Sequence, residues 1–223
     1  MNDDGSDRLS GDQIMAMDGM GDWRSMYHAL QGRFLTGDFA TGLEMVNRIG
    51  VVAEDLGHHP DLDLRYGHLN VRLYSHDVFG KTERDVELAR KISQIARDLG
   101  VAADPASIAV TEIGLDTWDV DEIRPFWKAV LGLNDNPRYA EELRDDDGEG
   151  LTLWFQETDR HDEPRQRFHL DIRVPVEQAK PRIEAALAAG GRLVADDMSP
   201  RFTVLADAQG NKVCVCTHVG RRD

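Results

Sequence analysis

The chain has 223 residues, of which 41% are hydrophobic and 30% charged, and its formal net charge is −15 at pH 7. This composition is enough for a packed core, and the length suits one large domain or two small ones. The negative charge argues against sequence-independent binding to nucleic acid or to an anionic membrane surface, because both need clustered cations. We therefore expect the partner to be a small molecule or a second copy of the chain in a homo-oligomer.

The chain contains two cysteines, Cys214 and Cys216. Residues two apart on a strand point to the same face, so this pair is poorly placed to form a disulfide. The sequence shows no charged-then-apolar leader and no apolar run of membrane-spanning length. These features predict a reduced, cytoplasmic protein.

The first hundred residues carry signals for helices packed on a sheet. Ser10-Gly-Asp-Gln13 has the form of a capping box, which predicts a short helix from residue 10 to about residue 17. Residues 23–35 alternate loosely and predict one or two strands. Asp38 can cap a longer helix that ends at Gly57. The apolar spacing of that helix predicts one buried stripe, made of Phe39, Leu43, Val46, Ile49 and Leu56.

A regular strand pattern follows residue 67. One face carries Leu69, Val71 and Leu73, and the other carries Asn70, Arg72, Tyr74 and His76. His76 is therefore expected on the face that does not pack against the helices. Thr82 is a good N-cap for a last helix, with Asp85 in its first turn and Gly100 at its end. Together these elements predict an α+β domain over residues 9–100, a two-layer arrangement with helices on one face of an antiparallel sheet.

A short linker is predicted at residues 101–107, and the element order changes beyond it. Strands are expected at 108–117 and 151–157, with a helix at 120–131 between them. A second set of elements repeats this order: a strand at 167–174, a helix at 176–189, and strands at 192–195, 202–205 and 212–216. We interpret residues 108–219 as a duplicated βαβββ domain, with Glu112 and His169 at equivalent positions of the two units.

The chemistry-bearing stretch of the first domain runs from Glu54 to Asp85. His58 and His59 are adjacent, and Pro60 restricts His59 to extended backbone angles. Imidazole accepts a proton and imidazolium donates one near pH 7, so these two and His76 suit general acid–base catalysis. A metal site is a less favoured alternative, because adjacent histidines at a helix end rarely aim at one ion and no cysteine assists. Asp85, taken alone, is explained as well by a helix cap as by catalysis.

This stretch resembles a known family signature. Glu54-x-x-x-His58-His59-Pro60 is followed by an aromatic residue after five positions, a histidine after nine and an aspartate after eight, filled here by Tyr66, His76 and Asp85. The pattern is similar to that of the pterin-4a-carbinolamine dehydratases, and the similarity covers residues 9–100.

The resemblance implies dehydration of 4a-hydroxytetrahydrobiopterin to the quinonoid dihydropterin, a step in tetrahydrobiopterin recycling, with no metal or organic cofactor. It implies that the catalytic residues are His58, His59 and His76. The implied substrate-binding residues are Trp23, Glu54, Pro60, Ser75, Asp77, Val78 and Asp85. Because family members also partner transcription regulators, a binding or dimerisation role is the alternative.

One segment departs from the family pattern. Many members have Gly-Gly-Leu-Thr before the last helix, and this chain has Phe79-Gly80-Lys81-Thr82. We expect Phe79 to affect the pocket or an oligomer contact more than the type of reaction.

The second half resembles a glyoxalase/bleomycin-resistance-type domain of the vicinal oxygen chelate superfamily. The similarity lies in Phe126-Trp-Lys-Ala-Val-Leu-Gly132, in His169-Leu-Asp-Ile172 and in Ala206-Asp-Ala-Gln-Gly-Asn211. The superfamily's four metal positions correspond here to Glu112, Gln156, His169 and Cys214. A cysteine at the last position departs from hard-cation chemistry, so a metal-free fold is favoured over a bound metal. Alternatives for this half are a lyase, a dioxygenase or a module that sequesters small molecules.

Overall fold

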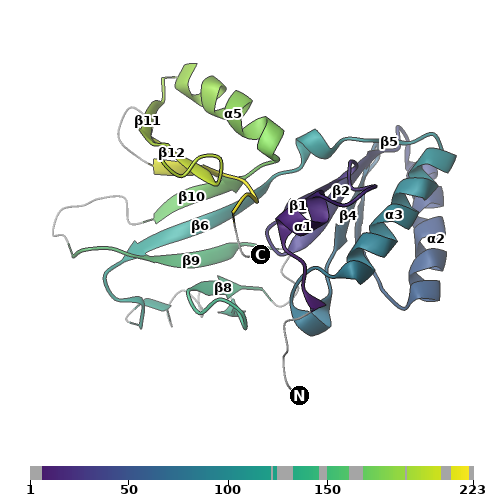
Figure 1. Cartoon of the computed structure of the whole chain (residues 1–223), viewed down its shortest axis with the longest axis horizontal. Coiled ribbons are helices and arrows are strands. Elements are labelled where there is room, and N and C mark those ends of the chain that lie inside the picture. Colours follow the sequence, from purple (N-terminus) through teal and green to yellow (C-terminus); the bar gives the residue numbers. More distant parts are fainter. Residues whose placement is uncertain are drawn as a thin grey trace. The chain divides into compact units, whose positions relative to one another are not determined.

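The computed structural model describes residues 7–121, 123–124, 133–145, 150–160, 168–188, 190–206 and 212–220. The chain forms two compact units (Figure 1). Unit 1 consists mainly of Met1–Ala109, with Pro175–Gln178 and His218–Asp223 grouped to it, and unit 2 of Val110–Val174 and Ala179–Thr217. No helix in the described ranges is both long and apolar enough to cross a membrane.

Unit 1 is the predicted two-layer α+β domain. In chain order its elements are α1 (Gly11–Met15), β1 (Trp23–Met26), β2 (Ala29–Leu35), α2 (Phe39–Leu56), β3 (Asp61–Leu64), β4 (Leu69–Leu73), a 3-10 turn (His76–Val78), α3 (Glu83–Asp98) and β5 (Ala102–Ala103). The strands form an antiparallel sheet in the order β1-β2-β4-β3, with β5 paired to β2. Figure 1 shows α2 and α3 side by side on one face of this sheet.

The helix ends follow their capping residues. The Ser10 side chain accepts from the Gln13 amide, and the Gln13 side chain accepts from the Ser10 amide, which completes the predicted capping box of α1. Asp38 accepts from the Thr41 amide at 2.8 Å at the start of α2. Gly57 ends α2 with φ of 59°, a left-handed conformation that favours glycine.

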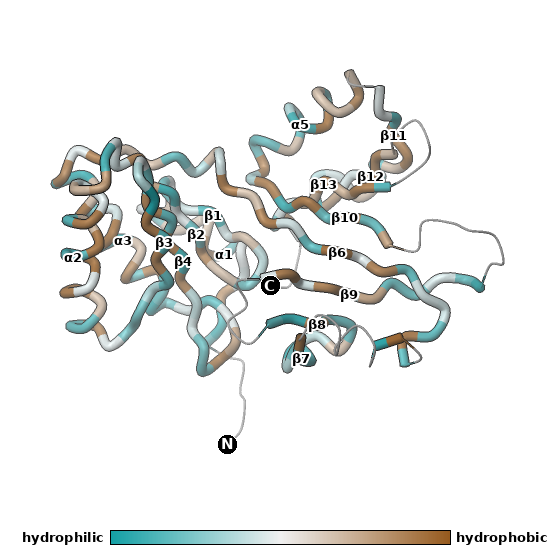
Figure 2. The backbone as a smooth tube through the Cα atoms, turned by 180° about the vertical axis from the view of Figure 1, so that it is seen from behind, coloured by the Kyte–Doolittle hydropathy of each residue, from teal (hydrophilic) through white to brown (hydrophobic). Residues whose placement is uncertain are grey.

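The predicted stripe of α2 is confirmed in its second half and wrong in its first. Ile49 is fully buried, and Val46 and Leu56 pack against the core. Phe39 and Leu43, however, are 49% and 46% exposed, and the helix buries Gly42, Met45 and Ala53 beside Ile49. A Cβ on Gly42 would lie 2.5 Å from Cδ1 of Leu64, so this glycine permits close contact between α2 and β3. The packing face therefore runs through both small and large residues, and Figure 2 shows hydrophobic and hydrophilic residues alternating along α2.

Two further expectations differ from the structure. Strand β4 ends at Leu73, so His76 lies in the 3-10 turn rather than on a strand. The chain reverses there because Ser75 and Gly80 pair through their backbones, with Ser75 N donating to Gly80 O at 2.9 Å. The expected linker, residues 101–107, contains β5, which completes the sheet of unit 1 beside Phe34 and Leu35.

Unit 2 contains one mixed sheet. Its elements are β6 (Val110–Thr117), β7 (Asn134–Asp135), β8 (Glu142–Arg144), β9 (Thr152–Glu157), β10 (Phe168–Arg173), α5 (Val176–Ala188), β11 (Arg192–Ala195), β12 (Phe202–Ala206) and β13 (Lys212–Cys216). The strand order is β11-β12-β13-β10-β6-β9-β8-β7.

The pairing in unit 2 supports the predicted duplication. In each half the first strand pairs in parallel with the last, β6 with β9 and β10 with β13, and the two first strands pair antiparallel at the centre. The helix expected at 120–131 falls largely outside the described residues, as do the motifs at 126–132 and 207–211. The second helix, predicted at 176–189, is confirmed as α5.

Candidate active site

His58 is placed by the end of α2. The left-handed Gly57 turns the chain, and the His58 amide donates to the carbonyl of Ala53 at 3.1 Å. This turn directs the imidazole inward, so His58 is only 8% exposed. Its Nε2 lies 2.8 Å from Oδ1 of Asp85, whose side chain is fully buried at the start of α3.

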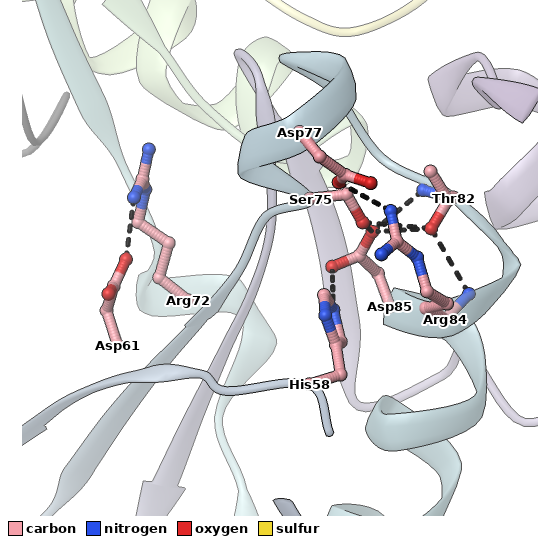
Figure 3. A network of polar contacts seen from close by, with 8 residues as sticks. All are labelled: His58, Asp61, Arg72, Ser75, Asp77, Thr82, Arg84 and Asp85. Atoms are coloured by element: carbon pink, nitrogen blue, oxygen red, sulfur yellow. Dashed lines mark hydrogen bonds and ion pairs between the residues drawn. The ribbon is translucent and has the colours of Figure 1, made fainter. Parts of the chain in front are cut away.

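Asp85 is the centre of a buried polar network (Figure 3). Oδ2 accepts from the Thr82 amide at 2.7 Å and from the Ser75 hydroxyl at 2.8 Å. The hydroxyls of Ser75 and Thr82 are themselves 2.9 Å apart. Asp85 therefore caps α3 and contacts His58 at the same time. The predicted cap is confirmed, and a part of Asp85 in catalysis stays a prediction. The network also connects His58 to Ser75, the residue before His76.

His76 follows Ser75 in the chain and is exposed. Its ring makes an edge-to-face contact with Tyr74, with centroids 4.9 Å apart. The guanidinium of Arg72 lies 5.2 Å from the centre of the same Tyr74 ring, and its Nη1 donates to Asp61 at 2.7 Å. Arg72, Tyr74 and His76 thus share one side of the chain, as the alternation predicted, although only Arg72 belongs to β4.

His59 points the other way from His58. Its side chain is 60% exposed, and Nε2 lies 3.2 Å from Oε1 of Glu54, which is 80% exposed. The adjacent histidines therefore occupy different environments, one buried against a carboxylate and one at the surface. Glu54 therefore contacts the imidazole of His59 from the last turn of α2.

Four other predicted residues divide between core and surface. Trp23 is completely buried and donates from Nε1 to Ser93 at 2.9 Å, so it belongs to the core between sheet and helices rather than to a pocket wall. Pro60 is half-buried directly before β3, and Val78 is half-buried with its carbonyl accepting from Arg8. Asp77 is exposed, and its hydrogen bond with Arg84 at 2.6 Å lowers the pKa of the Asp77 carboxyl.

The departure from the family pattern has a clear local consequence. Phe79 adopts φ of 49° and ψ of 53°, the left-handed conformation that a glycine takes without strain. Its side chain is 42% exposed, while the neighbouring Lys81 is buried and donates from Nζ to the carbonyl of Tyr27 at 3.0 Å. Tyr66, the aromatic residue of the motif, is 75% exposed and does not belong to the core.

Three further residues line these contacts: Thr82, which the sequence indicates only as a helix cap, and Arg72 and Tyr74, which lie outside the family motif. The signal for Arg72 and Tyr74 was their alternation with His76. For Thr82 the indication was the capping pattern of α3. The Asp85 carboxylate that accepts from the Thr82 amide also contacts His58. Within the described residues, the one group of three or more His, Cys, Asp or Glu side chains that could hold a metal ion lies in unit 2.

The metal candidates of unit 2 are not brought together as predicted. Glu112 is buried and accepts from Nη2 of Arg173 at 2.8 Å; burial raises the pKa of this carboxyl, and Arg173 opposes the shift. Gln156 is exposed and donates to the carbonyl of Glu157. His169 lies between two carboxylates, and its contact with Asp171 raises the pKa of the imidazole above its ordinary value, against the effect of burial.

The comparisons with known proteins fall on the two units separately. The family model for pterin 4 alpha carbinolamine dehydratase matches residues 7–95. A protein of Thermomicrobium roseum named "Putative pterin-4-alpha-carbinolamine dehydratase" is 36% identical over 74 residues, which are 33% of this chain and 80% of the relative. The chain belongs to the pterin-4a-carbinolamine dehydratase family. A relative of the same name in Nocardia farcinica is 34% identical over 90 residues, 40% of this chain and 95% of the relative.

A second family model, for a glyoxalase-like domain, matches residues 112–216. The chain therefore joins a pterin-4a-carbinolamine dehydratase domain to a glyoxalase-like domain. A crystal structure described as transcriptional coactivator/pterin dehydratase from Brucella melitensis is 32% identical and covers 40% of this chain and 98% of that one, with a TM-score of 0.36.

Proposed function

We propose that unit 1 eliminates water from a 4a-hydroxytetrahydropterin, such as 4a-hydroxytetrahydrobiopterin, to give the quinonoid dihydropterin. The observation that carries the proposal is the buried pair of His58 and Asp85, with Nε2 and Oδ1 2.8 Å apart. Family membership supports the substrate class, and the His58 imidazole beside Asp85 is a group that can transfer protons.

Asp85 determines which nitrogen of His58 can exchange a proton with the substrate. Its Oδ2 already accepts from the Thr82 amide and the Ser75 hydroxyl, so the carboxylate is surrounded by donors and acts as an acceptor. His58 then offers Nε2–H to Oδ1, and Nδ1 remains for proton exchange with the substrate. A carboxylate in this position also stabilises the imidazolium that forms when Nδ1 takes a proton.

The reaction needs two proton movements and no change of oxidation state. The bond from C4a to the hydroxyl oxygen breaks, and the oxygen leaves as water after receiving a proton from an acid. The proton on N5 passes to a base, and the electrons of that N–H bond form the new C=N bond to C4a. We assign one role to His58 and the other to His76, an exposed imidazole that solvent can reprotonate.

Steady-state turnover of a 4a-hydroxytetrahydropterin tests the proposal. His58→Ala and His76→Ala should each reduce kcat by about 100-fold or more, the range of a lost acid–base group. His68→Ala is the matched control, because His68 belongs to the same stretch of chain but to none of the contacts around Asp85, and it should keep the wild-type rate. Wild-type rates in both His58→Ala and His76→Ala would refute the assignment.

A further inference from the structure

The imidazole of His76 is exposed and lies in a short turn beyond the end of β4. Within the described ranges of the chain, no hydrogen bond or ion pair holds this ring, and its ring contact is with Tyr74. An exposed side chain without fixed contacts changes rotamer within picoseconds to nanoseconds. We propose that Tyr74, supported by Arg72 and Asp61, is a positioning residue that fixes the orientation of the His76 imidazole. The catalytic value of this support rests on the proposed function of unit 1.

The contact between the two rings has a defined geometry. The centroids of Tyr74 and His76 are 4.9 Å apart, and the ring planes meet at 89°. Perpendicular contacts between aromatic rings are favourable, because the edge of one ring is positive and the face of the other is negative. The Tyr74 ring therefore favours one orientation of the imidazole over the others that the turn would allow.

Tyr74 is itself held in place. The residue directly follows β4 and is 2% exposed. The guanidinium of Arg72 lies over its ring, 5.2 Å from the centroid. A cation over an aromatic face is attracted by the negative charge density of the ring, and the planar guanidinium stacks well on it. The imidazole of His76 therefore contacts a ring that has little freedom to turn.

Arg72 is fixed in turn by Asp61. The two residues are register partners on β4 and β3, and Nη1 of Arg72 donates to Oδ2 of Asp61 at 2.7 Å (Figure 3). Their side chains are 16% and 35% exposed, so solvent screens this charge-assisted bond only in part. Asp61 directly follows Pro60. The ion pair thus joins the segment behind His58 and His59 to the strand that leads to His76.

Orientation matters for the role assigned to His76. A proton is transferred only when its donor and acceptor are within hydrogen-bond reach, about 2.6–3.2 Å apart. An imidazole that turns freely about its side-chain bonds spends little time in that geometry, and the reaction loses rate accordingly. Tyr74 and Arg72 act through His76 in this scheme, and the scheme requires no contact between them and the reacting atoms.

Nuclear magnetic resonance of the full chain with isotope-labelled histidine tests the orientation without any pterin. His76→Gln identifies the ring signals of His76 by removing them. Tyr74→Leu should move these signals toward those of an unstructured histidine, because the ring current of Tyr74 is lost. Tyr74→Phe should keep them near their wild-type positions, because the contact is made by the ring. Arg72→Met should move them in the same direction by a smaller amount, because the ring remains but loses its support.

Steady-state turnover of a 4a-hydroxytetrahydropterin tests the effect on the reaction. Tyr74→Leu should reduce kcat roughly 10- to 100-fold, the range for a misplaced reacting group, with little change in KM. Tyr74→Phe should restore kcat, and Arg72→Met should reduce it less than Tyr74→Leu does. Circular dichroism checks the fold of each variant, and Arg72→Met carries both tests if Tyr74→Leu does not fold.

Arg65→Met is the matched control. Arg65 pairs with Asp63 at 2.8 Å on the same β3–β4 hairpin, and the two side chains are 66% and 48% exposed. Among the contacts of the described residues, none joins Arg65 to an aromatic ring. Its variant should therefore keep both the wild-type kcat and the His76 signals.

Two outcomes would overturn the inference. The first is a set of His76 ring signals that stays unchanged in both Tyr74→Leu and Arg72→Met. The second is wild-type kcat in these two variants while His76→Ala loses its rate, which would mean that the contact does not serve the reaction. Failure of the proposed function gives a different pattern. The wild-type chain would then not turn over the pterin, whereas the His76 signals would still move in Tyr74→Leu, so the support of His76 would stand.

Discussion

His58 and Asp85 are 27 residues apart in the sequence, and their side chains meet at 2.8 Å with exposures of 9% and 0%. The contact joins the end of α2 to the beginning of α3. One carboxylate thus performs two tasks, because its second oxygen caps α3 through the Thr82 amide. Folding of the helix start and orientation of the proposed catalytic histidine are therefore coupled through a single side chain.

The substitution Asp85→Asn should separate the cap of α3 from the interaction of Asp85 with His58. The amide oxygen can still accept from the Thr82 amide, so the cap is largely kept, but the negative charge that stabilises the imidazolium of His58 is lost. We expect kcat to fall by about 100-fold with little change in KM. We also expect the free energy of unfolding to fall by about 1–3 kcal/mol, as for a disturbed buried hydrogen-bond network.

Glu83→Gln is the control for this change. Glu83 lies in the same first turn of α3 as Asp85, but its side chain is exposed. Steady-state kinetics and urea unfolding of both variants should show a large loss of kcat only in Asp85→Asn. Equal kinetics in the two variants would show that Asp85 serves the helix alone.

The sequence predicted the layers of unit 1 well, because capping residues and strand alternation are local signals. Ser10, Asp38 and Thr82 all cap the helices expected of them. The buried face of α2 was predicted correctly at Val46, Ile49 and Leu56 and wrongly at Phe39 and Leu43. In the first turns hydrophobicity pointed to Phe39, whereas close packing selected Gly42. That choice depends on the approach of Leu64, a residue outside the helix that a local pattern does not contain.

The candidate site of unit 1 and the metal candidates of unit 2 also depend partly on local patterns and partly on contacts that only the fold shows. The spacing of the histidines identified His58, but only the fold shows that it is buried against Asp85 and that His59 faces solvent. In unit 2, the resemblance selected Glu112 by position along its strand. Arg173, on the adjacent strand, engages that carboxylate instead, and such cross-strand partners follow from register, which the sequence alone did not provide.

Phe79→Gly should stabilise unit 1. A bulky residue in the left-handed conformation costs roughly 1–3 kcal/mol, while the extra chain entropy of an unfolded glycine offsets about 0.4–1 kcal/mol of the gain. Phe79 is 42% exposed, so the change removes the packing of only part of its surface. We expect a higher urea midpoint. Phe39→Gly is the control at similar exposure, and it should lower the midpoint, because Phe39 begins a helix and has no such strain to relieve.

The Asp38 cap should make stability depend on pH. Hydrogen bonds from Thr41 lower the pKa of Asp38 in the folded protein, so its contribution is present above the ordinary pKa of aspartate and is lost as pH falls through the lowered value. Asp38→Ala should therefore lower the urea midpoint at pH 7, and the difference from wild type should shrink below about pH 4. Asp55→Ala should show no loss at pH 7, because a carboxylate in the last turn of α2 opposes the helix dipole. A constant difference for Asp38→Ala at every pH would contradict the capping role.

The buried pair of Glu112 and Arg173 offers a stability test in unit 2. Changing one partner leaves the other charged and without its counter-ion in a site that solvent barely reaches, so Arg173→Met or Glu112→Leu alone should destabilise the unit by about 3–5 kcal/mol. The double variant should recover most of this loss, because replacing both charges with apolar groups removes the desolvation cost of each. Thermal and urea unfolding of the four proteins completes a double-mutant cycle. Additive losses in the double variant would show that the two side chains do not depend on each other, despite their 2.8 Å contact.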